Sequence, residues 1–527
     1  MKLYFIISLI PGFFYLLYKS KKALHMLQQN YYDDGHRYVS WMLQNLSKVF
    51  VNVDVVFFMF LLLKSYPAMI TFEFYFIVCY ILEKYRRSKE QSKKPLVFTP
   101  RVKRLCVTTV IIYVLYVLSF TYSNFNDNYI GLYYFYIALL VYLNWFVIML
   151  ANIINKPIEK LVFLYYKNKA TTKINQMTNL KRISITGSYG KTSTKNALND
   201  ILNVKYNSFA TEKSFNTMNG LMISINNKLD KFTDIFVSEM GAFKRGEIKE
   251  LCDLFHPQYG IITTIGTAHL ESFGSQENIQ KGKFELIDSL PEDGIAVLNM
   301  DDPYQVSYKI KSKCKVVWVS MKDKKADVYA SNNKLSNKAT TFTCHFKDKK
   351  ESVTLETKLL GEKNVYNILE AIALSYNLGL TLDEIKTGVK RIKTVEHRLE
   401  LKKFGNINII DDAYNSNVEG SKMALDVLNL MDGKKIVCTP GMIELGEKQY
   451  EYNMEFGRHI AKVCDEVILI GEEQTKPIQD GLKKEKYKEN KIHILNDVKE
   501  AFPLMRKLAD GDTYVLLEND LPDIFNE

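Results

Sequence analysis

The chain has 527 residues and a net charge of +11, and 47% of its residues are hydrophobic. At about 150 residues per domain, this length excludes a single ordinary domain and suggests about three. Much of the positive charge flanks apolar segments and the rest is scattered lysine, so we expect no nucleic-acid partner. Seven widely spaced cysteines without a CxxC pair argue against a disulfide framework and a zinc site, and favour a reducing compartment.

Apolar segments fill the first part of the chain and predict an α-helical membrane domain over residues 1–155. They cover residues 3–18, 49–63, 68–83, 105–122 and 130–154. Only the last two are long enough to cross a hydrocarbon layer about 30 Å thick, and the first three are short or marginal. The first has no small-residue cleavage site, which argues against a signal peptide. The alternative is that these segments are buried helices of a soluble protein.

The charges between these segments predict an orientation. Lys and Arg gather after the first and third segments, whereas residues 123–129 contain neither and the turn after the second contains only Lys64. With five spans, the positive-inside rule places the N-terminus outside and everything after about residue 155 in the cytoplasm. We therefore expect a multi-pass cell-membrane protein with cytoplasmic catalytic domains. Glu73 is the one acid within a span, and the amphipathic stretch 27–46 is expected along the inner surface.

The rest of the chain alternates strand-like and helical segments, which predicts α/β domains with parallel sheets. One series of strands is expected at 182–186, 234–238, 260–265, 295–299 and 315–319, and another at 407–411, 435–439, 466–470, 491–495 and 513–517. The segment 361–390 between the two series is predicted to be helical. We therefore place a central domain at 156–397 and a C-terminal domain at 398–527.

Residues 182–194, RISITGSYGKTST, have the layout of a phosphate-binding loop between a strand and a helix. Glycines let backbone N–H groups turn toward a polyphosphate, and the N-terminus of the next helix favours its negative charge. Lys191 would reach the β- and γ-phosphates, and the Thr192 hydroxyl would hold Mg²⁺. Only two residues separate Gly187 from Gly190, whereas the general nucleotide signature has four at this point. The predicted ligands are ATP and Mg²⁺.

Further motifs follow the loop in order. They are Thr211–Gly220, Ser238–Ala242, Thr267–Glu271, Lys281–Glu285, Gly361–Asn367, His397–Arg398 and Asp411–Asn417. Together with the short loop, they resemble the Mur ligases, ATP-dependent enzymes that join a carboxylate to the amine of an amino acid or peptide. The string 411–417 and the segment 441–446 are similar in particular to the branch that adds D-alanyl-D-alanine. The resemblance covers about residues 180–475. It implies a P-loop ATPase domain of Mur ligase type followed by a Rossmann-like domain.

The resemblance also implies roles for individual residues. ATP would be bound by Gly187, Ser188, Tyr189, Gly190, Lys191, Thr192, Ser193, Asn364, Asn367, Arg398 and Asp412. Magnesium would be held by Thr192, Glu239, His269 and, if it is carbamylated, Lys283. Taken without the resemblance, Glu239 is also consistent with a helix cap, His269 with a core histidine, and Lys283 with a surface lysine. Lys281 is close enough to Lys283 to confuse that assignment.

The remaining expected roles concern the reaction. Lys191, His269, Lys283 and Arg398 are expected to be catalytic. The substrates are expected to contact Thr211, Asn216, Tyr414, Asn415 and Asn417. The implied reaction forms an acyl phosphate from the carboxylate and ATP, and an amine then displaces phosphate. Domain closure would bring Arg398 and Asp412 onto the nucleotide.

The chain departs from the peptidoglycan enzymes of this family, because apolar segments stand where those enzymes have a UDP-binding domain. Its C-terminal segment also lacks the Lys-Gly-Ser ending of the branch that adds D-alanyl-D-alanine, which argues against D-alanyl-D-alanine as the amine. We therefore expect a membrane-anchored amide ligase acting on a cell-wall precursor, with a lipid-linked or UDP-linked carboxylate and an amino acid or dipeptide amine. One alternative is a ligase that makes a polyamino acid or another amidated metabolite. The other is a nucleotide-binding regulator of envelope synthesis that does not ligate, and the intact motifs count against it.

Overall fold

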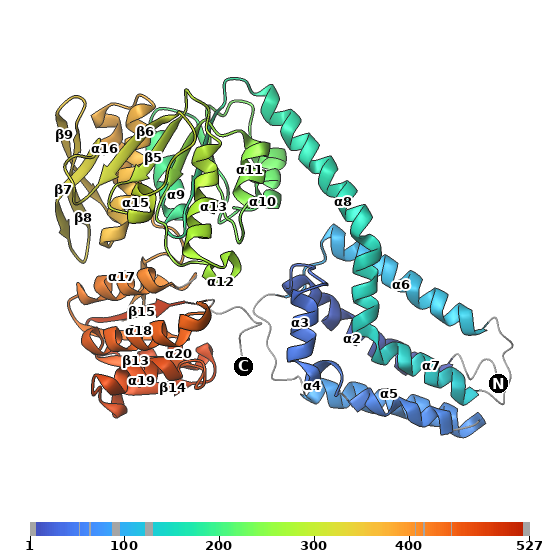
Figure 1. The fold of residues 1–527 in the computed structure, drawn as a ribbon. Helices are drawn as coiled ribbons and strands as arrows, with labels where there is room; N and C mark the ends of the chain where they lie inside the picture. The colour runs from blue at the N-terminus through green and yellow to red at the C-terminus, as the bar shows by residue number, and fades with distance from the viewer. Residues whose placement is uncertain are drawn as a thin grey trace. The chain divides into compact units, whose positions relative to one another are not determined.

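The computed structural model describes most of the chain as two compact units, and the division between them falls between residues 165 and 166. The described ranges are 7–51, 53–62, 65–86, 95–121, 130–405, 407–414, 417–443 and 445–519. Figure 1 shows the N-terminal unit as helical and the second unit as two α/β parts. Each unit is described by itself below.

Helices with an aromatic core make up the N-terminal unit. Its elements are α2 (Ile10–Gln29), α3 (Arg37–Gln44), α4 (Leu46–Val49), the 3-10 helix η1 (Val53–Leu62), α5 (Ser65–Arg86), α6 (Pro100–Thr121), α7 (Ile130–Tyr142) and α8 (Asn144–Gln176), which continues into the second unit. Phe72 and Tyr134 lie at the centre of the core, with ring centroids 4.2 Å apart. Lys19 and Asp54 form a buried ion pair at 2.5 Å.

Few of these helices are both long enough and apolar enough to cross a membrane. In the described part of the chain, one helix, α6 over residues 100–119, is long and apolar enough to cross a membrane. Helices α7 and α8, bent by 66°, would add a second if they are counted as one span. The expected number of five spans is thus not reproduced. One reason is that η1 and α7 have only 10 and 13 residues, and a single span needs about 20.

The central part of the second unit contains, within the described residues, a nine-stranded sheet in the order β2-β3-β1-β4-β5-β6-β7-β8-β9. Strands β1 to β7 run parallel, and β8 and β9 extend the sheet through the antiparallel pairs β7–β8 and β8–β9. The strands are β1 (Lys181–Thr186), β2 (Ser208–Ala210), β3 (Ile235–Glu239), β4 (Tyr259–Ile262), β5 (Ile295–Asn299), β6 (Lys315–Ser320), β7 (Val328–Leu335), β8 (Thr340–Phe346) and β9 (Glu351–Thr357).

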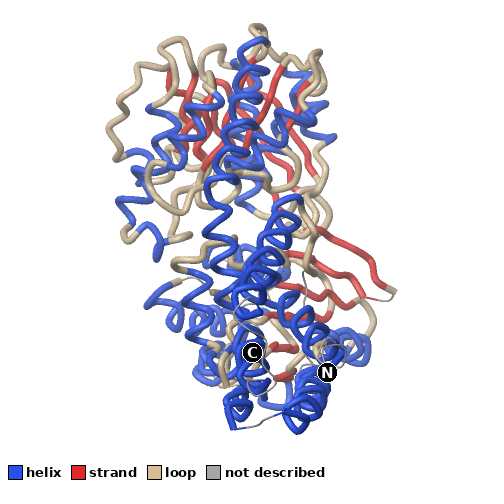
Figure 2. The backbone as a smooth tube through the Cα atoms, turned by 90° about the vertical axis from the view of Figure 1, so that its right-hand side faces the viewer, coloured by secondary structure: helices blue, strands red, loops and turns tan. Residues whose placement is uncertain are grey.

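Helices cover both faces of this sheet (Figure 2). The helices of this part are α9 (Lys191–Leu202), α10 (Met218–Ile223), the π-helix η3 (Ser224–Lys228), α11 (Glu247–Phe255), α12 (Leu270–Phe273), α13 (Gln276–Asp288), α14 (Pro303–Val306), α15 (Glu362–Asn377) and α16 (Leu382–Arg391). Side chains alternate along each strand. Ile261 of β4 therefore joins the core under α9 and α15. Its neighbour Gly260 lies on the other face, against Leu286 and Ile287 of α13.

The C-terminal part has, in the described ranges, a six-stranded sheet in the order β10-β11-β15-β12-β13-β14. All its strand pairs are parallel except β10 with β11. The elements are β10 (Glu400–Phe404), β11 (Ile407–Asp412), α17 (Val418–Asn429), β12 (Lys434–Thr439), η4 (Gly446–Lys448), α18 (Gln449–Val463), β13 (Glu466–Ile470), α19 (Lys476–Lys484), η5 (Glu489–Lys491), β14 (Ile492–Leu495), α20 (Val498–Leu508) and β15 (Thr513–Glu518).

The predicted strands of both series are confirmed, each with shifts at its ends, and the helical segment 361–390 is confirmed as α15 and α16. The prediction missed the edge strands β2 and β10 and the antiparallel strands β7 to β9. Strand β2 has only three residues, β10 is mostly polar, and buried positions alternate with half-buried ones along β8. The α/β fold with parallel sheets is as expected.

Candidate functional site

The loop from Gly187 to Gly190 joins the carboxyl end of β1 to the N-terminus of α9, and its backbone requires both glycines. Gly187 has φ of 148° and Gly190 has φ of 84°, and such positive values favour glycine. A Cβ atom at Gly187 would overlap the Thr263 hydroxyl, and one at Gly190 would overlap the amide oxygen of Asn367. The loop is therefore packed closely against the end of β4 and against α15.

The two residues between these glycines hold the loop to the segment after β4. The Ser188 backbone N–H donates to the carbonyl of Thr264 at 2.6 Å, and its hydroxyl donates to the carbonyl of Gly266 at 3.2 Å. The Tyr189 ring lies so close to Gly266 that no Cβ atom would fit there. Ser193 lies half-buried in the first turn of α9. The loop and the residues leading to His269 are thus one packed structure.

Lys191 begins α9 and folds back over the loop. Its ammonium donates to the carbonyls of Gly187 at 2.9 Å and Ser188 at 3.2 Å. Burial lowers the pKa of Lys191, the nearby Glu239 opposes that shift, and Arg398 adds to it. A cationic side chain placed on a loop with turned backbone N–H groups suits a polyphosphate.

Glu239 lies beside the loop because β1 and β3 are neighbours in register, with Ile185 opposite Glu239. Its carboxylate is buried. It accepts hydrogen bonds from the Thr192 hydroxyl at 2.8 Å and from the Asn216 amide at 3.2 Å. The Thr211 hydroxyl accepts a hydrogen bond from the Glu239 backbone N–H at 3.2 Å. The predicted metal ligands Thr192 and Glu239 and the predicted substrate residues Thr211 and Asn216 are therefore brought together.

The oxygen atoms of Thr192 and Glu239 fit a magnesium ion. Mg²⁺ prefers oxygen ligands and is commonly held by one or two carboxylates together with phosphate oxygens and water. Among the described residues, no group of three or more His, Cys, Asp and Glu side chains could hold a metal ion. A magnesium ion that arrives with a nucleotide does not need such a group, because the phosphates supply ligands. When bound, the ion would neutralise charge on the phosphates.

His269 and Lys283 are close enough to Lys191 for its positive charge to lower their pKa values. Burial, Lys191 and Lys283 together lower the pKa of His269 to about 4, so the imidazole is neutral at neutral pH and its nitrogen can bind a cation. Burial and Lys191 lower the pKa of Lys283 to about 7, and Glu247 and Glu285 oppose that shift. Lys283 is 2% exposed, whereas Lys281 is exposed and pairs with Glu277. The interpretation of Lys283 as a surface lysine is thus wrong.

Asn364 and Asn367 lie near the start of α15 and are both buried. The Asn364 amide donates to the carbonyl of Leu360 at 2.8 Å, and the Asn367 amide donates to the Asn364 side-chain oxygen at 3.1 Å. Asn367 also contacts Gly190 of the loop. These asparagines therefore connect α15 to the loop and are not helix-surface residues.

The C-terminal candidates gather around the start of β10 and the end of β11. The Arg398 guanidinium lies over the Tyr414 ring, 4.3 Å from its centroid. Asp412 accepts a hydrogen bond from the Leu399 backbone N–H at 3.2 Å. Burial raises the pKa of Asp412, which Arg398 opposes. The Asn417 side-chain oxygen accepts from Gly420 N–H at 2.8 Å and caps α17, while Asn415 lies outside the described residues.

Sequence reasoning missed Lys195 and Thr263. Lys195 is fully buried and its ammonium lies 3.4 Å from Glu239. A signal for it exists, because Lys195 follows Lys191 by four residues and so lies on the same face of α9. Thr263 contacts Gly187, and only the fold reveals that contact.

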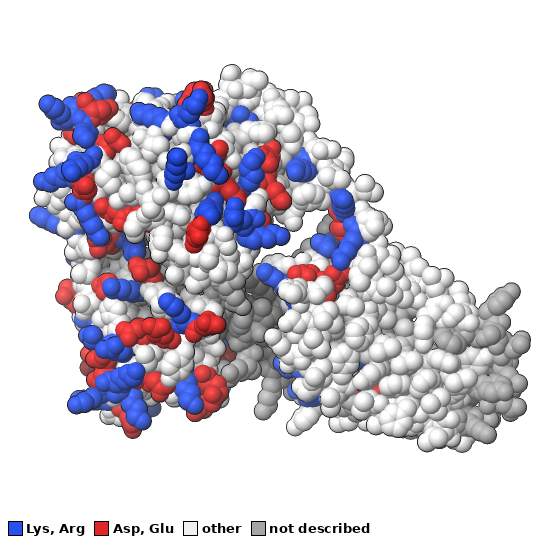
Figure 3. All heavy atoms as spheres, in the orientation of Figure 1, with Lys and Arg blue, Asp and Glu red and all other residues white. Residues whose placement is uncertain are grey.

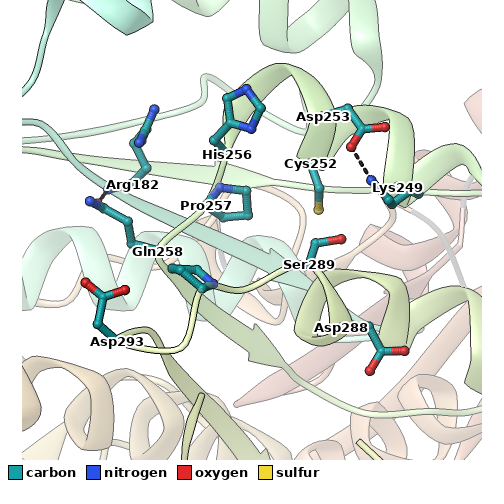
Figure 4. A pocket seen from close by; sticks show the side chains of 11 residues that line it. Arg182, Lys249, Cys252, Asp253, His256, Pro257, Gln258, Asp288, Ser289 and Asp293 are labelled. Atoms are coloured by element: carbon teal, nitrogen blue, oxygen red, sulfur yellow. Dashed lines mark hydrogen bonds and ion pairs between the residues drawn. The ribbon is translucent and has the colours of Figure 1, made fainter. Parts of the chain in front are cut away.

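A separate polar pocket of about 520 Å³ lies at the opposite, amino end of β1 and β4. Figure 4 shows its lining, with Arg182, His256 and Gln258 on one side and Lys249 paired with Asp253 on the other. It contains none of the predicted site residues.

Known proteins place this arrangement in a family. Residues 185–375 match the model of the Mur ligase middle domain, and residues 397–517 match that of the Mur ligase, glutamate ligase domain. The UDP-N-acetylmuramoyl-tripeptide–D-alanyl-D-alanine ligase of Buchnera aphidicola is 31% identical over 364 residues, which are 67% of this chain and 78% of that protein. The ligase of the same name from Escherichia coli is 31% identical over 303 residues, or 57% of this chain and 66% of that protein.

A solved structure agrees with these matches. The MurF ligase from Thermotoga maritima in complex with ADP is 27% identical, with a TM-score of 0.60, and the match covers 69% of this chain and 81% of that one. The loop, the carboxylate beside it and the second α/β domain define a nucleotide-binding α/β protein. The chain belongs to the Mur ligase family, whose members are ATP-dependent, magnesium-using enzymes that form amide bonds. The match covers just under two thirds of the E. coli relative.

Proposed function

We propose that this protein is a membrane-anchored ligase that uses ATP to join a carboxylate to an amine in a peptidoglycan-type precursor. One observation carries the proposal. The phosphate-binding loop, the Thr192–Glu239 pair and the electrostatically coupled Lys191, His269 and Lys283 lie at one edge of the central sheet. The relatives carry names that specify a UDP-N-acetylmuramoyl-tripeptide and D-alanyl-D-alanine. We therefore propose a UDP-linked or lipid-linked peptide carboxylate and an amino acid or dipeptide amine as substrates.

In the proposed reaction, a carboxylate oxygen attacks the γ-phosphorus of ATP, and the bond from that phosphorus to the ADP oxygen breaks. The amine then attacks the acyl carbon, loses a proton and displaces phosphate to leave the amide. Lys191 and the loop N–H groups would hold the phosphates during both steps, because they supply positive charge and hydrogen-bond donors beside them. Arg398 and Asp412 would close over the nucleotide from the C-terminal domain.

Membrane anchoring is supported by the surface of the N-terminal unit. Large apolar side chains of α6 are exposed along one side of the helix, including Val107, Val110, Ile111, Val114, Leu115 and Leu118, each at least half exposed. On the face drawn in Figure 3, the described residues of this unit include few charged side chains compared with those of the α/β unit. An apolar surface of this extent is unusual for a protein surrounded by water and typical of one that contacts lipid.

The basic residues at the start of α6 support an orientation. Arg101, Lys103 and Arg104 precede the apolar stretch of the helix, which favours the cytoplasmic side for this end. If α7 and α8 return across the membrane as one bent span, the α/β unit also lies in the cytoplasm, where ATP is available. We therefore propose a cell-membrane location with cytoplasmic catalytic domains.

The test is turnover by the full chain in lipid nanodiscs. ADP release is measured with pairs of UDP-linked or lipid-linked muramoyl peptides and amines, D-alanyl-D-alanine included. A productive pair should raise the rate. Lys191→Ala should lower it by about 10²-fold or more, and the exposed Lys386→Ala should leave it unchanged. If no pair raises the rate and Lys191→Ala binds Mg-ADP as tightly as the original protein does, the ligase proposal is wrong.

A further inference from the structure

Lys195 is a buried lysine that the reaction described above does not use. It lies one turn after Lys191 on α9, and its side chain is 1% exposed. Among the described residues, Glu239 is its one ion-pair partner, at 3.4 Å. The ammonium also donates a hydrogen bond to the backbone carbonyl of Lys213. A buried ammonium is stable only where such partners replace water, so these two contacts hold Lys195 in place.

The segment 211–216 is connected to Glu239 at both ends. Thr211 accepts a hydrogen bond from the Glu239 backbone N–H, and the Asn216 amide donates to the Glu239 carboxylate. The Asn216 carbonyl also accepts from the Gly241 N–H at 2.7 Å. Lys195 adds a third connection at the middle of the segment, through the carbonyl of Lys213.

The backbone conformation of Lys213 shows what the hydrogen bond from Lys195 holds in place. Its φ is 47°, in the left-handed region that costs free energy for a residue with a Cβ atom. Such a conformation persists where surrounding contacts hold it. The hydrogen bond from Lys195 to the Lys213 carbonyl is such a contact, so the shape of the segment depends on where the Lys195 ammonium lies.

Glu239 therefore connects the binding of a cation to the position of the Lys195 ammonium. Its carboxylate oxygens already accept hydrogen bonds from Thr192 and Asn216 and face Lys195. A magnesium ion bound with nucleotide would compete for the same oxygens, and the Lys195 ammonium would then depend more strongly on the Lys213 carbonyl. A buried ammonium that loses part of its ion pair is left with an uncompensated cost of burial, so the carbonyl of Lys213 becomes its main remaining partner.

We propose that Lys195 is a positioning residue that transmits the binding of Mg²⁺ and nucleotide at Thr192 and Glu239 to the segment 211–216. Binding of the nucleotide and its cation would then hold the segment more firmly in one conformation for the carboxylate substrate. This inference rests on the proposed function in one respect, because it takes Glu239 as a ligand of the cation.

Hydrogen exchange of the full chain, with ADP alone and with Mg²⁺ and ADP, tests the proposal without a substrate. In the original protein, Mg²⁺ should slow exchange of the amides in 211–216 by about five- to tenfold, a usual size for coupling between sites. In Lys195→Met, the slowing at 211–216 should be lost while the protection of 187–194 by nucleotide remains. In Lys195→Gln, an amide can still donate to Lys213, so baseline protection of the segment should return without the Mg²⁺-dependent change.

Lys205→Met is a matched control. Lys205 follows the same helix, donates to the carbonyl of Gly379 at 2.6 Å and pairs with Glu384 at 3.7 Å, so it has the same two kinds of partner away from the loop. The Lys205→Met variant should leave the hydrogen exchange of residues 211–216 unchanged.

The exchange results separate a failure of the transmission proposal from a failure of the proposed function. If Mg²⁺ does not slow exchange at 211–216 in the original protein although 187–194 is protected, the transmission proposal is wrong, and no variant is needed to show it. Full Mg²⁺-dependent slowing in Lys195→Met would also overturn it. If neither segment responds to Mg²⁺ and ADP in the original protein, the proposed function itself fails.

Discussion

Gly190 illustrates how a single residue position sets the shape of the nucleotide loop. Its φ of 84° and its contact with Asn367 leave no room for a side chain. We expect Gly190→Ala to lower the affinity for Mg-ADP by at least about tenfold and to destabilise the protein by about 1–2 kcal/mol or more, because backbone strain and overlap add. Isothermal titration with Mg-ADP and thermal unfolding measure the two effects.

Gly471→Ala is the control for that prediction. Gly471 has the same φ of 84°, but an added Cβ would lie 3.4 Å from Gln474, an ordinary contact distance. The Gly471→Ala variant should lose stability through backbone strain alone and should bind Mg-ADP with normal affinity. Equal affinities in both variants would show that the contact with Asn367 does not shape the loop.

The surroundings of Lys283 change the chemistry of its side chain. Burial and Lys191 lower its pKa to about 7, so a neutral amine that can add carbon dioxide is available near neutral pH. We expect a carbamate signal by carbon-13 NMR after addition of labelled bicarbonate, present in Lys281→Ala and absent in Lys283→Ala. A signal that survives Lys283→Ala would assign the modification elsewhere.

At the scale of elements, the pairing of α9 with α15 buries an acid. Glu370 of α15 is 1% exposed and accepts a hydrogen bond from the Thr194 hydroxyl at 3.3 Å. Burial raises its pKa well above the usual value. A raised pKa in the folded state means that Glu370 stabilises the fold below its unfolded pKa of about 4.5, and that this contribution is lost as the pH rises toward the folded pKa.

Glu370→Gln should therefore raise the free energy of unfolding at pH 7 to 8, because an amide oxygen can accept the same hydrogen bond without a charge. The gain should shrink toward pH 4 to 5. Denaturant unfolding monitored across this pH range measures it, and the exposed Glu356→Gln on β9 provides the comparison. A gain that does not change with pH would contradict the assignment of a raised pKa.

The elements also show what sequence could and could not predict. Buried parallel strands such as β1 and β4 are recognisable because they are runs of β-branched residues, and their carboxyl ends place the motif residues together. Strands β7 and β9 were missed because polar residues occupy their exposed positions. The contact of Asn367 with Gly190 joins residues far apart in sequence, and the ammonium of Lys195 meets Glu239 only through the register of β1 with β3.

At the scale of the whole molecule, the apolar side of α6 should decide the membrane location. We expect the double variant Ile111→Arg and Leu115→Arg to reduce the fraction of protein retained in membranes after carbonate extraction. A charged residue at the centre of a span costs about 2.5–3.5 kcal/mol. Leu161→Arg, at an exposed position of α8 beyond the expected span, should have no such effect. Unchanged retention in the double variant would argue against α6 as a span.

Helix α8 has a practical consequence for dissecting the protein. The division between the two units falls inside this helix, which runs without interruption from Asn144 to Gln176. Its last turns belong to the α/β unit, because Ala170 and Ile174 are fully buried and the Tyr166 carbonyl accepts a hydrogen bond from Asn226 at 3.0 Å. A truncated protein that starts at the first motif, near β1, would therefore lose part of its own packing. An isolated catalytic fragment needs the end of a helix that begins in the other unit.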